Sequence, residues 1–219
     1  MRVNIIIVGA GRVGMYMAER LEKDHEISII EKDKDLAQEA SRALDALVIQ
    51  GDGTETKTLE EAGVKNADAL AGVTGQDEIN LLSCLLAKSL GVKNVFARVG
   101  KPDYIEVFKS LGIDHVVSPE LSAADRLFKL ITRPVATDLA LIEGSDVEIL
   151  EFTIQEGSMV RGKKVGEIPP DGFLIISVKK GDEVNIPNAN TVLEEGDKVW
   201  IVVKSNVVKS ATKLFAVPE

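Results

Sequence analysis

The chain has 219 residues, of which 45% are hydrophobic and 4% aromatic, and its formal net charge is −9. This length exceeds what one small domain needs, so we expect one large domain with a smaller one. The negative charge, without a run of Lys or Arg longer than two residues, argues against a nucleic-acid partner and against a polybasic membrane anchor.

The sequence also indicates a compartment. No apolar stretch approaches the roughly 20 residues that cross a bilayer, and a predicted strand directly after Arg2 leaves no room for a secretory signal peptide. The single cysteine, Cys84, excludes an internal disulfide and suits a reducing environment. We therefore expect a cytoplasmic protein.

In the first half, short apolar runs alternate with helical patterns. Runs rich in Val, Ile and Leu predict strands at 3–8, 27–31, 46–50, 69–73, 95–99 and 115–118. Between them, apolar residues recur at helical spacing, and glycines that fit helix ends follow at Gly63, Gly91 and Gly112. This succession predicts an α/β fold with a doubly wound parallel Rossmann sheet.

The second half has another pattern. An amphipathic helix is predicted over 121–131 before Pro134, and a short helical stretch over 135–142. Strands are then predicted at 147–154, 174–179 and 198–203, with short helices at 160–168 and 206–215. We therefore predict a Rossmann domain at 1–134, a linker helix at 135–145 and a small α+β domain at 146–219.

The clearest motif is Gly9-Ala10-Gly11-Arg12-Val13-Gly14, which follows the first strand and opens the first helix. In such a motif the first glycine makes the turn, the second lets the backbone approach a pyrophosphate and the third lets helix and strand pack closely. Glu31 ends the second strand, where a carboxylate accepts hydrogen bonds from ribose hydroxyls and repels a 2′-phosphate. Lys32 is adjacent and weakens this bias, so NADP is disfavoured but not excluded.

Further motifs follow at the ends of the later strands. They are Gly51-Asp52-Gly53-Thr54, Val73-Thr74, Asp77-Glu78-Ile79-Asn80, Arg98 and Ser118-Pro119-Glu120. With the Gly157–Gly166 stretch and the late Glu195-Gly196-Asp197, this succession resembles the regulator-of-potassium-conductance (RCK) family, in particular the Trk/Ktr-type regulatory subunits of potassium uptake. The resemblance covers nearly the whole chain.

The resemblance implies a role for each matching position. Arg12 and Arg98 would contact phosphates, Glu31 the ribose, and Asp52 and Gly53 the adenine. Val73 and Thr74 would line the same cleft, and Glu120 would approach a neighbouring subunit's nucleotide or a divalent ion. The implied ligand is NAD(H) or an adenine nucleotide (ATP, ADP or AMP). The candidate binding residues are Gly9, Gly11, Arg12, Val13, Gly14, Glu31, Lys32, Asp52, Gly53, Val73, Thr74 and Arg98.

Simpler roles remain open for several residues. Asp52 in its Gly-Asp-Gly sequence also suits a turn, and Arg98 could pair with a surface acid. Cys84 fits a buried helix position better than a nucleophilic role. His25 and His115 have no sequence-local metal-ligand spacing, so we interpret both as structural and predict no metal site.

Three functions compete for this sequence. A dehydrogenase shares the glycine motif but usually needs a His, Lys or Tyr acid–base group on a substrate domain, and the last ~75 residues contain no His or Tyr. A redox-sensing transcription regulator would need a basic DNA-reading element. We therefore favour a non-enzymatic regulatory subunit that gates a potassium-translocating membrane protein. The helix at 121–131 would cross to a second copy and give a homo-oligomer.

Overall fold

A computed structural model describes residues 2–113, 115–132, 137–141, 145–169 and 171–216. The chain divides into two compact units, Met1–Ala124 and Asp125–Glu219, and each is described by itself. None of the helices within the described residues is long and apolar enough to cross a membrane.

The first unit is built on a six-stranded parallel sheet with the strand order β3-β2-β1-β4-β5-β6. This is the doubly wound Rossmann order, in which the chain reverses direction across the sheet between β1 and β4. The prediction of a Rossmann sheet is thus confirmed. The strands are β1 (Asn4–Val8), β2 (Glu26–Glu31), β3 (Leu47–Gln50), β4 (Ala69–Gly72), β5 (Asn94–Arg98) and β6 (His115–Val117).

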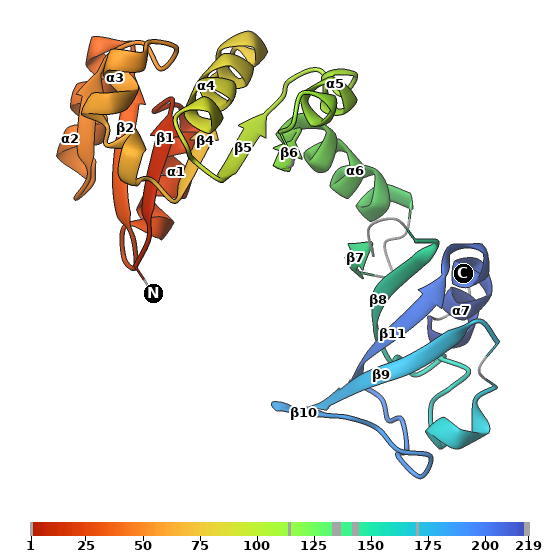
Figure 1. The fold of residues 1–219 in the computed structure, drawn as a ribbon. Coiled ribbons are helices and arrows are strands. Elements are labelled where there is room, and N and C mark those ends of the chain that lie inside the picture. Colours follow the sequence, from red (N-terminus) through yellow and green to blue (C-terminus); the bar gives the residue numbers. More distant parts are fainter. Residues whose placement is uncertain (1, 114, 133–136, 142–144, 170, 217–219) are drawn as a thin grey trace. The chain divides into compact units, whose positions relative to one another are not determined.

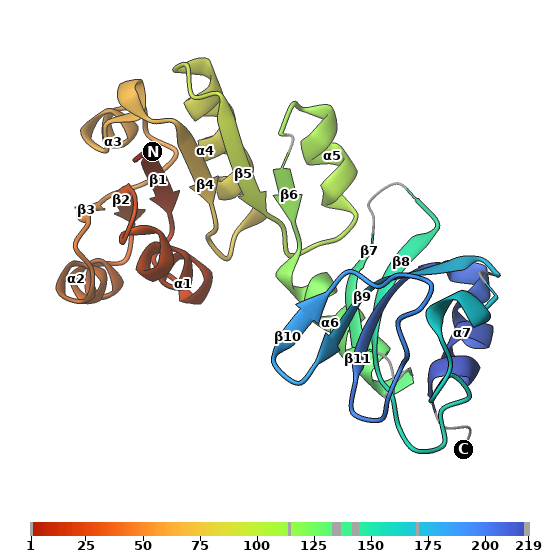
Figure 2. The same cartoon turned by 90° about the horizontal axis from the view of Figure 1, so that it is seen from below.

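Helices cover both faces of this sheet (Figures 1 and 2). Figure 2 shows α1 and α2 on one side and α3, α4 and α5 on the other. Because successive strand side chains point to opposite faces, Ile6 is buried in one core and Ile7 in the other. The helices are α1 (Arg12–Leu21), α2 (Lys34–Ala43), α3 (Thr56–Glu61), the 3₁₀ turn η1 (Val64–Asn66), α4 (Asp77–Ser89) and α5 (Tyr104–Ser110).

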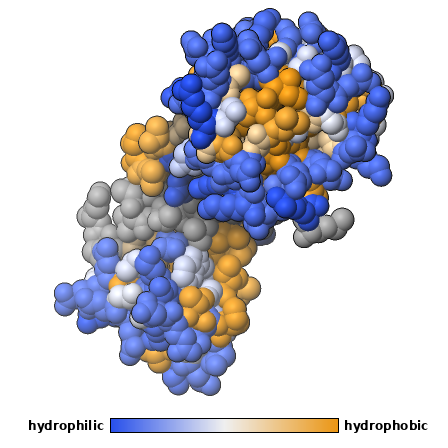
Figure 3. Space-filling view, turned by 90° about the vertical axis from the view of Figure 1, so that its left-hand side faces the viewer, coloured by the Kyte–Doolittle hydropathy of each residue, from blue (hydrophilic) through white to orange (hydrophobic). Residues whose placement is uncertain are grey.

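Local signals mark the ends of these helices, and the predicted glycine positions are confirmed. The side chain of Asp33 accepts hydrogen bonds from the backbone N–H groups of Asp35 and Leu36 and so caps α2. Gly63, Gly91 and Gly112 follow α3, α4 and α5, and all three have positive φ. Figure 3 shows that part of this unit's surface is hydrophobic and is surrounded by hydrophilic residues.

Helix α6 (Pro119–Thr132) extends across the division between the units, which lies after Ala124. The second unit contains a five-stranded antiparallel sheet with the order β10-β9-β11-β8-β7. Within the core of this unit, the ring of Phe215 in the last helix stacks on Phe152 with ring centroids 5.3 Å apart. The same ring meets Phe173 edge-on with centroids 5.5 Å apart. Its elements are β7 (Thr137–Leu141), β8 (Val147–Thr153), η2 (Val165–Glu167), β9 (Phe173–Lys180), β10 (Glu183–Asn185), β11 (Lys198–Lys204), η3 (Ser205–Val207) and α7 (Val208–Phe215).

Two helices predicted for this half are wrong. The stretch expected to be helical at 135–142 is strand over its described residues, because β7 pairs with β8; residues 135, 136 and 142 lie outside the described residues. The helix expected at 160–168 is reduced to η2. There the chain pairs with a distant segment instead: the Gly162 N–H donates to the Leu193 carbonyl at 2.7 Å, and the Val165 N–H donates to the Thr191 carbonyl at 2.8 Å. The sequence did not predict strand β10. The closing helix predicted at 206–215 is confirmed as α7.

Candidate functional site

A cleft of about 940 Å³ lies at the carboxyl ends of the parallel strands in the first unit. This is where ligands bind in open α/β sheets, and the volume falls within the range of small-molecule sites. Every candidate residue named from the sequence lines this cleft except Gly14. Additional lining residues include Tyr16, Met17, Arg20, Leu36, Gln76, Ile79 and Glu120.

The three glycines of the motif occupy different environments. Gly9 has φ +108°, and a side chain there would also press on Thr74. Gly11 precedes α1, and a Cβ built on it meets nothing within 4 Å. A Cβ on Gly14 would lie 1.9 Å from the Gly9 carbonyl oxygen, so Gly14 permits the close contact between α1 and the loop. Gly11 is therefore the glycine that leaves space beside the helix N-terminus.

The carboxylate of Glu31 holds the glycine-rich loop in place. One oxygen accepts from the Ala10 N–H at 2.6 Å and the other from the Asp33 N–H at 2.8 Å. A carboxylate has about four lone-pair positions, so two further hydrogen bonds can still be accepted. Glu31 thus fixes the turn between β1 and α1 and retains capacity for hydroxyl donors.

Asp52 forms the turn that the simpler interpretation predicted for it. Its Oδ1 accepts from the Thr54 hydroxyl at 2.6 Å and from the Thr54 N–H at 3.0 Å, while Lys32 Nζ lies 2.9 Å from Oδ2. These hydrogen bonds, first the Thr54 hydroxyl and then Lys32, lower the pKa of Asp52 to about 2. The same ion pair raises the pKa of exposed Lys32. Gly53 lies against β1, since its Cβ would approach Val8 Cγ1 to 2.3 Å.

Asn80 organises one wall of the cleft. It belongs to the Asp77–Asn80 motif that carries the family resemblance, but the sequence did not predict it as a site residue. It is fully buried. Its Oδ1 accepts from the Thr74 N–H at 2.8 Å and from the Thr74 hydroxyl at 2.7 Å. Its Nδ2 donates to the carbonyls of Thr74 at 3.1 Å and of Arg98 at 2.9 Å. One side chain of α4 therefore ties together the ends of β4 and β5. A polar residue in the first turn of the helix that follows β4 is the sequence signal that could have identified it.

Arg98 projects from the end of β5 toward the start of α6. Its Nη1 donates to the Thr74 carbonyl at 3.3 Å, and its Nη2 forms an ion pair with Glu120. Its Nε is buried and has no hydrogen-bond partner within the part of the chain that the structure describes. Arg98 therefore does pair with an acid, as the simpler interpretation held, and it also lines the cleft.

The electrostatics of the cleft suit an anionic ligand. The N-terminus of α1 has no side-chain cap, so its first-turn N–H groups are available to an anion. Four cationic side chains, Arg12, Arg20, Lys32 and Arg98, line the cleft with three carboxylates, those of Glu31, Asp52 and Glu120. Among the described residues, no cluster of His, Cys, Asp and Glu could hold a metal ion.

The other residues singled out from the sequence lie outside the cleft lining. Cys84 is buried in the core, where burial raises the pKa of its thiol to about 11, so it is not a nucleophile near neutral pH. His115 stacks on Phe96 with ring centroids 4.7 Å apart. The Nδ1 atom of His25 is buried and finds no hydrogen-bond partner in the described ranges.

Comparison with solved structures supports the fold. The GsuK channel bound to NAD superposes with a TM-score of 0.67 at 22% identity, covering 100% of this chain and 40% of that chain. GsuK bound to ADP gives a TM-score of 0.53 at 26% identity, covering 60% and 34%. The Kef C-terminal domain of Shewanella denitrificans in its AMP-bound form gives 0.51 at 23% identity, covering 59% and 80%.

Comparison of sequences identifies the family. Residues 5–119 match the TrkA-N domain, and residues 149–216 match the TrkA-C domain. A Trk system potassium uptake protein TrkA homolog of Methanothermobacter thermautotrophicus is 46% identical over 213 residues, covering 96% of this chain and 98% of the relative. A protein of the same name from Archaeoglobus fulgidus is 38% identical over 221 residues, but the chain spans only 50% of its length. The resemblance inferred from the motifs is thereby confirmed, and the chain belongs to the TrkA family of Trk system potassium uptake proteins.

Proposed function

We propose that this protein is a cytoplasmic, nucleotide-sensing regulatory subunit that gates a separate potassium-translocating membrane protein. The observation that carries the proposal is the cleft, in which a glycine-rich loop, an uncapped helix N-terminus, three arginines and the Glu31 carboxylate meet. Membership of the TrkA family supplies the link to potassium uptake. Similar folds are seen in proteins bound to NAD, ADP and AMP, which supports an adenine nucleotide or dinucleotide as the ligand.

The proposed pose follows the chemistry of the lining. The first turn of α1, Arg12 and Arg98 face the phosphates, and the free lone pairs of Glu31 accept from the ribose hydroxyls. Asp52 and Gly53 flank the adenine. Val73 and Thr74 form the wall at the end of β4. A 2′-phosphate would meet the Glu31 carboxylate, so NADP should bind more weakly than NAD.

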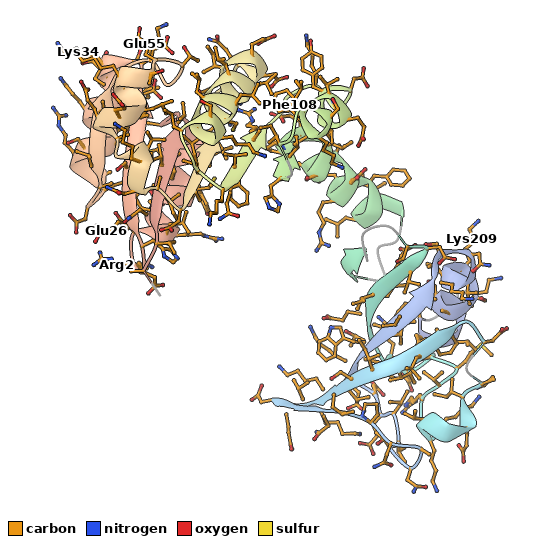
Figure 4. All side chains as sticks on the ribbon, in the orientation of Figure 1. Arg2, Glu26, Lys34, Glu55, Phe108 and Lys209 are labelled. Carbon is orange, nitrogen blue, oxygen red and sulfur yellow. The ribbon has the colours of Figure 1, made fainter. Side chains whose placement is uncertain are left out.

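Glu31 and Gly11 allow a direct calorimetric test of the site. Gly11→Leu places a side chain in open space at the cleft and should abolish binding of NADH and ADP, whereas Glu31→Ala should weaken it. Glu26→Ala is the matched control, because Glu26 lies at the opposite end of β2 beside Arg2 (Figure 4). Unchanged affinity in both cleft variants would remove this site from consideration.

We propose a regulatory output and not turnover. An NAD-dependent oxidoreductase remains the alternative, and its acid–base group would have to come from the lining, where Tyr16 is 65% exposed with Arg20 over its ring at 5.3 Å. A screen for NAD(H)-coupled oxidation and reduction should read at background. Reproducible, stoichiometric turnover with one substrate class would restore the oxidoreductase.

We also propose that α6 mediates self-association. Leu127 and Ile131 of this helix are 59% and 78% exposed, an unusual degree for large apolar residues on one amphipathic helix. Burial of this stripe against a second copy would give at least a dimer. Light scattering should show a dimer or larger assembly at micromolar concentration, and Leu127→Glu with Ile131→Glu should dissociate it. A wild-type monomer with and without nucleotide would contradict the proposal.

The gating role is tested by potassium flux through the partner membrane protein in liposomes. The protein is added with NADH, ATP or ADP, and at least one nucleotide should change the flux relative to another. A coupling free energy of about 1–3 kcal/mol would change the open-to-closed ratio by roughly 5- to 150-fold. Flux that is identical with and without the protein under every nucleotide would refute gating.

A further inference from the structure

The ion pair between Arg98 and Glu120 joins the candidate nucleotide cleft to helix α6. Arg98 ends β5, and Glu120 is in the first turn of α6. The Arg98 side chain is 23% exposed and that of Glu120 is 54% exposed, so solvent and ligand can reach the carboxylate. Both residues line the cleft.

Glu120 interacts with both arginines of the proposed phosphate site. Its pKa is lowered first by the backbone N–H at its own helix terminus, then by the hydrogen bond from Arg98 and the positive charges of Arg98 and Arg12. Arg98 retains a buried Nε–H that has no partner among the described residues, so its guanidinium is incompletely satisfied by them. The carboxylate thus acts as an internal anion where an external one is expected.

Ser118 also holds the start of α6. Ser118 is buried, and its side-chain oxygen accepts from the Leu121 N–H at 3.3 Å, while its carbonyl accepts from the Ser122 N–H at 3.0 Å. From this turn the helix continues past Ala124, the last residue of the first unit. A change at Glu120 is therefore a change at the base of the helix that leads out of the nucleotide-binding unit.

We propose that the Arg98–Glu120 pair is a latch that the ligand's phosphate opens by displacing the Glu120 carboxylate from Arg98. The inference rests on the proposed nucleotide site. A phosphate oxyanion and a carboxylate compete for the same planar guanidinium, and the phosphate can also reach the first-turn N–H groups of α1. Displacement leaves two negative charges facing each other, which loosens the first turn of α6 and passes the binding event to the helix.

The latch predicts that removal of Glu120 strengthens nucleotide binding. Glu120→Gln keeps the size of the side chain but removes the competing charge. Because exposed ion pairs contribute little, the affinity for ADP should rise by roughly 2- to 5-fold in low salt with EDTA present. Adenosine carries no phosphate, so its affinity should not change. Glu106→Gln is the matched control, since Glu106 also forms an exposed ion pair, with Lys109, but does not line the cleft.

Hydrogen exchange at the first turn of α6 provides the second measurement. ADP should accelerate exchange at residues 120–124 of the wild-type protein, whereas Glu120→Gln should exchange faster before any ligand is added. If Arg98→Gln weakens ADP binding but Glu120→Gln leaves affinity and exchange unchanged, the latch is wrong and the nucleotide site stands. If neither the wild type nor any variant binds ADP or NADH, the proposed nucleotide site fails and the latch fails with it.

Discussion

Asn80→Ala tests whether a single buried amide organises the cleft wall. The substitution removes four hydrogen bonds, three to atoms of Thr74 and one to the Arg98 carbonyl. At about 1 kcal/mol net for each bond, the loss is about 4 kcal/mol. Alanine returns about 0.5 kcal/mol through its better helix propensity. We therefore expect the free energy of unfolding of the first unit to fall by about 3.5 kcal/mol.

Ser83→Ala is the matched control on the same helix. Ser83 is also fully buried, but its hydroxyl makes one hydrogen bond, to the Ile79 carbonyl at 2.8 Å within α4 itself. Its removal should cost no more than about 1 kcal/mol. Urea denaturation followed by circular dichroism is the appropriate assay, because the single tryptophan, Trp200, is in the second unit and would not report on the first. Equal destabilisation by the two substitutions would refute the organising role of Asn80.

Three further predictions concern the same unit. Gly14→Ala should destabilise it by about 1–3 kcal/mol, because the clash of a Cβ 1.9 Å from the Gly9 carbonyl outweighs the gain in helix propensity. Gly11→Ala should have nearly wild-type stability in urea denaturation. Similar urea midpoints for the two variants would contradict this. Cys84, with a raised thiol pKa of about 11, should react with a thiol reagent at pH 8 only after denaturation, and rapid labelling of the native protein would exclude its burial. Asp52 has a lowered pKa of about 2 in the folded state, and it contributes no more than about 2 kcal/mol of stability. This contribution should be complete above about pH 5 and disappear as the pH falls toward 2. A difference in unfolding free energy between the wild type and Asp52→Asn that stays constant across that range would contradict it.

The first unit could be predicted largely from local sequence. Each strand, helix and terminal glycine is encoded within a few neighbouring residues, by apolar periodicity and by positive-φ glycines such as Gly63. The glycine motif and Glu31 could also be assigned together, because a βα turn and the next parallel strand place them at one sheet edge. The structure brings them into contact through the Ala10 N–H.

Long-range pairing decided what the sequence alone could not. Residues 137–141 form a strand because β8 supplies hydrogen-bonding partners along that edge, and residues 162–165 follow the distant 191–193 segment instead of forming a helix. Such partners override a weak local helical pattern.

The cleft shows the same division between local and tertiary information. The sequence determined that Thr74, Arg98 and Glu120 each lie at or just after the end of a strand, but only the folded sheet showed that Asn80 joins the first two and that Arg98 also contacts the third. Hydrogen bonds from these side chains to residues 18 to 24 positions away depend on which strands become neighbours. That adjacency is set by burial of the whole sheet and by no local stretch of the chain.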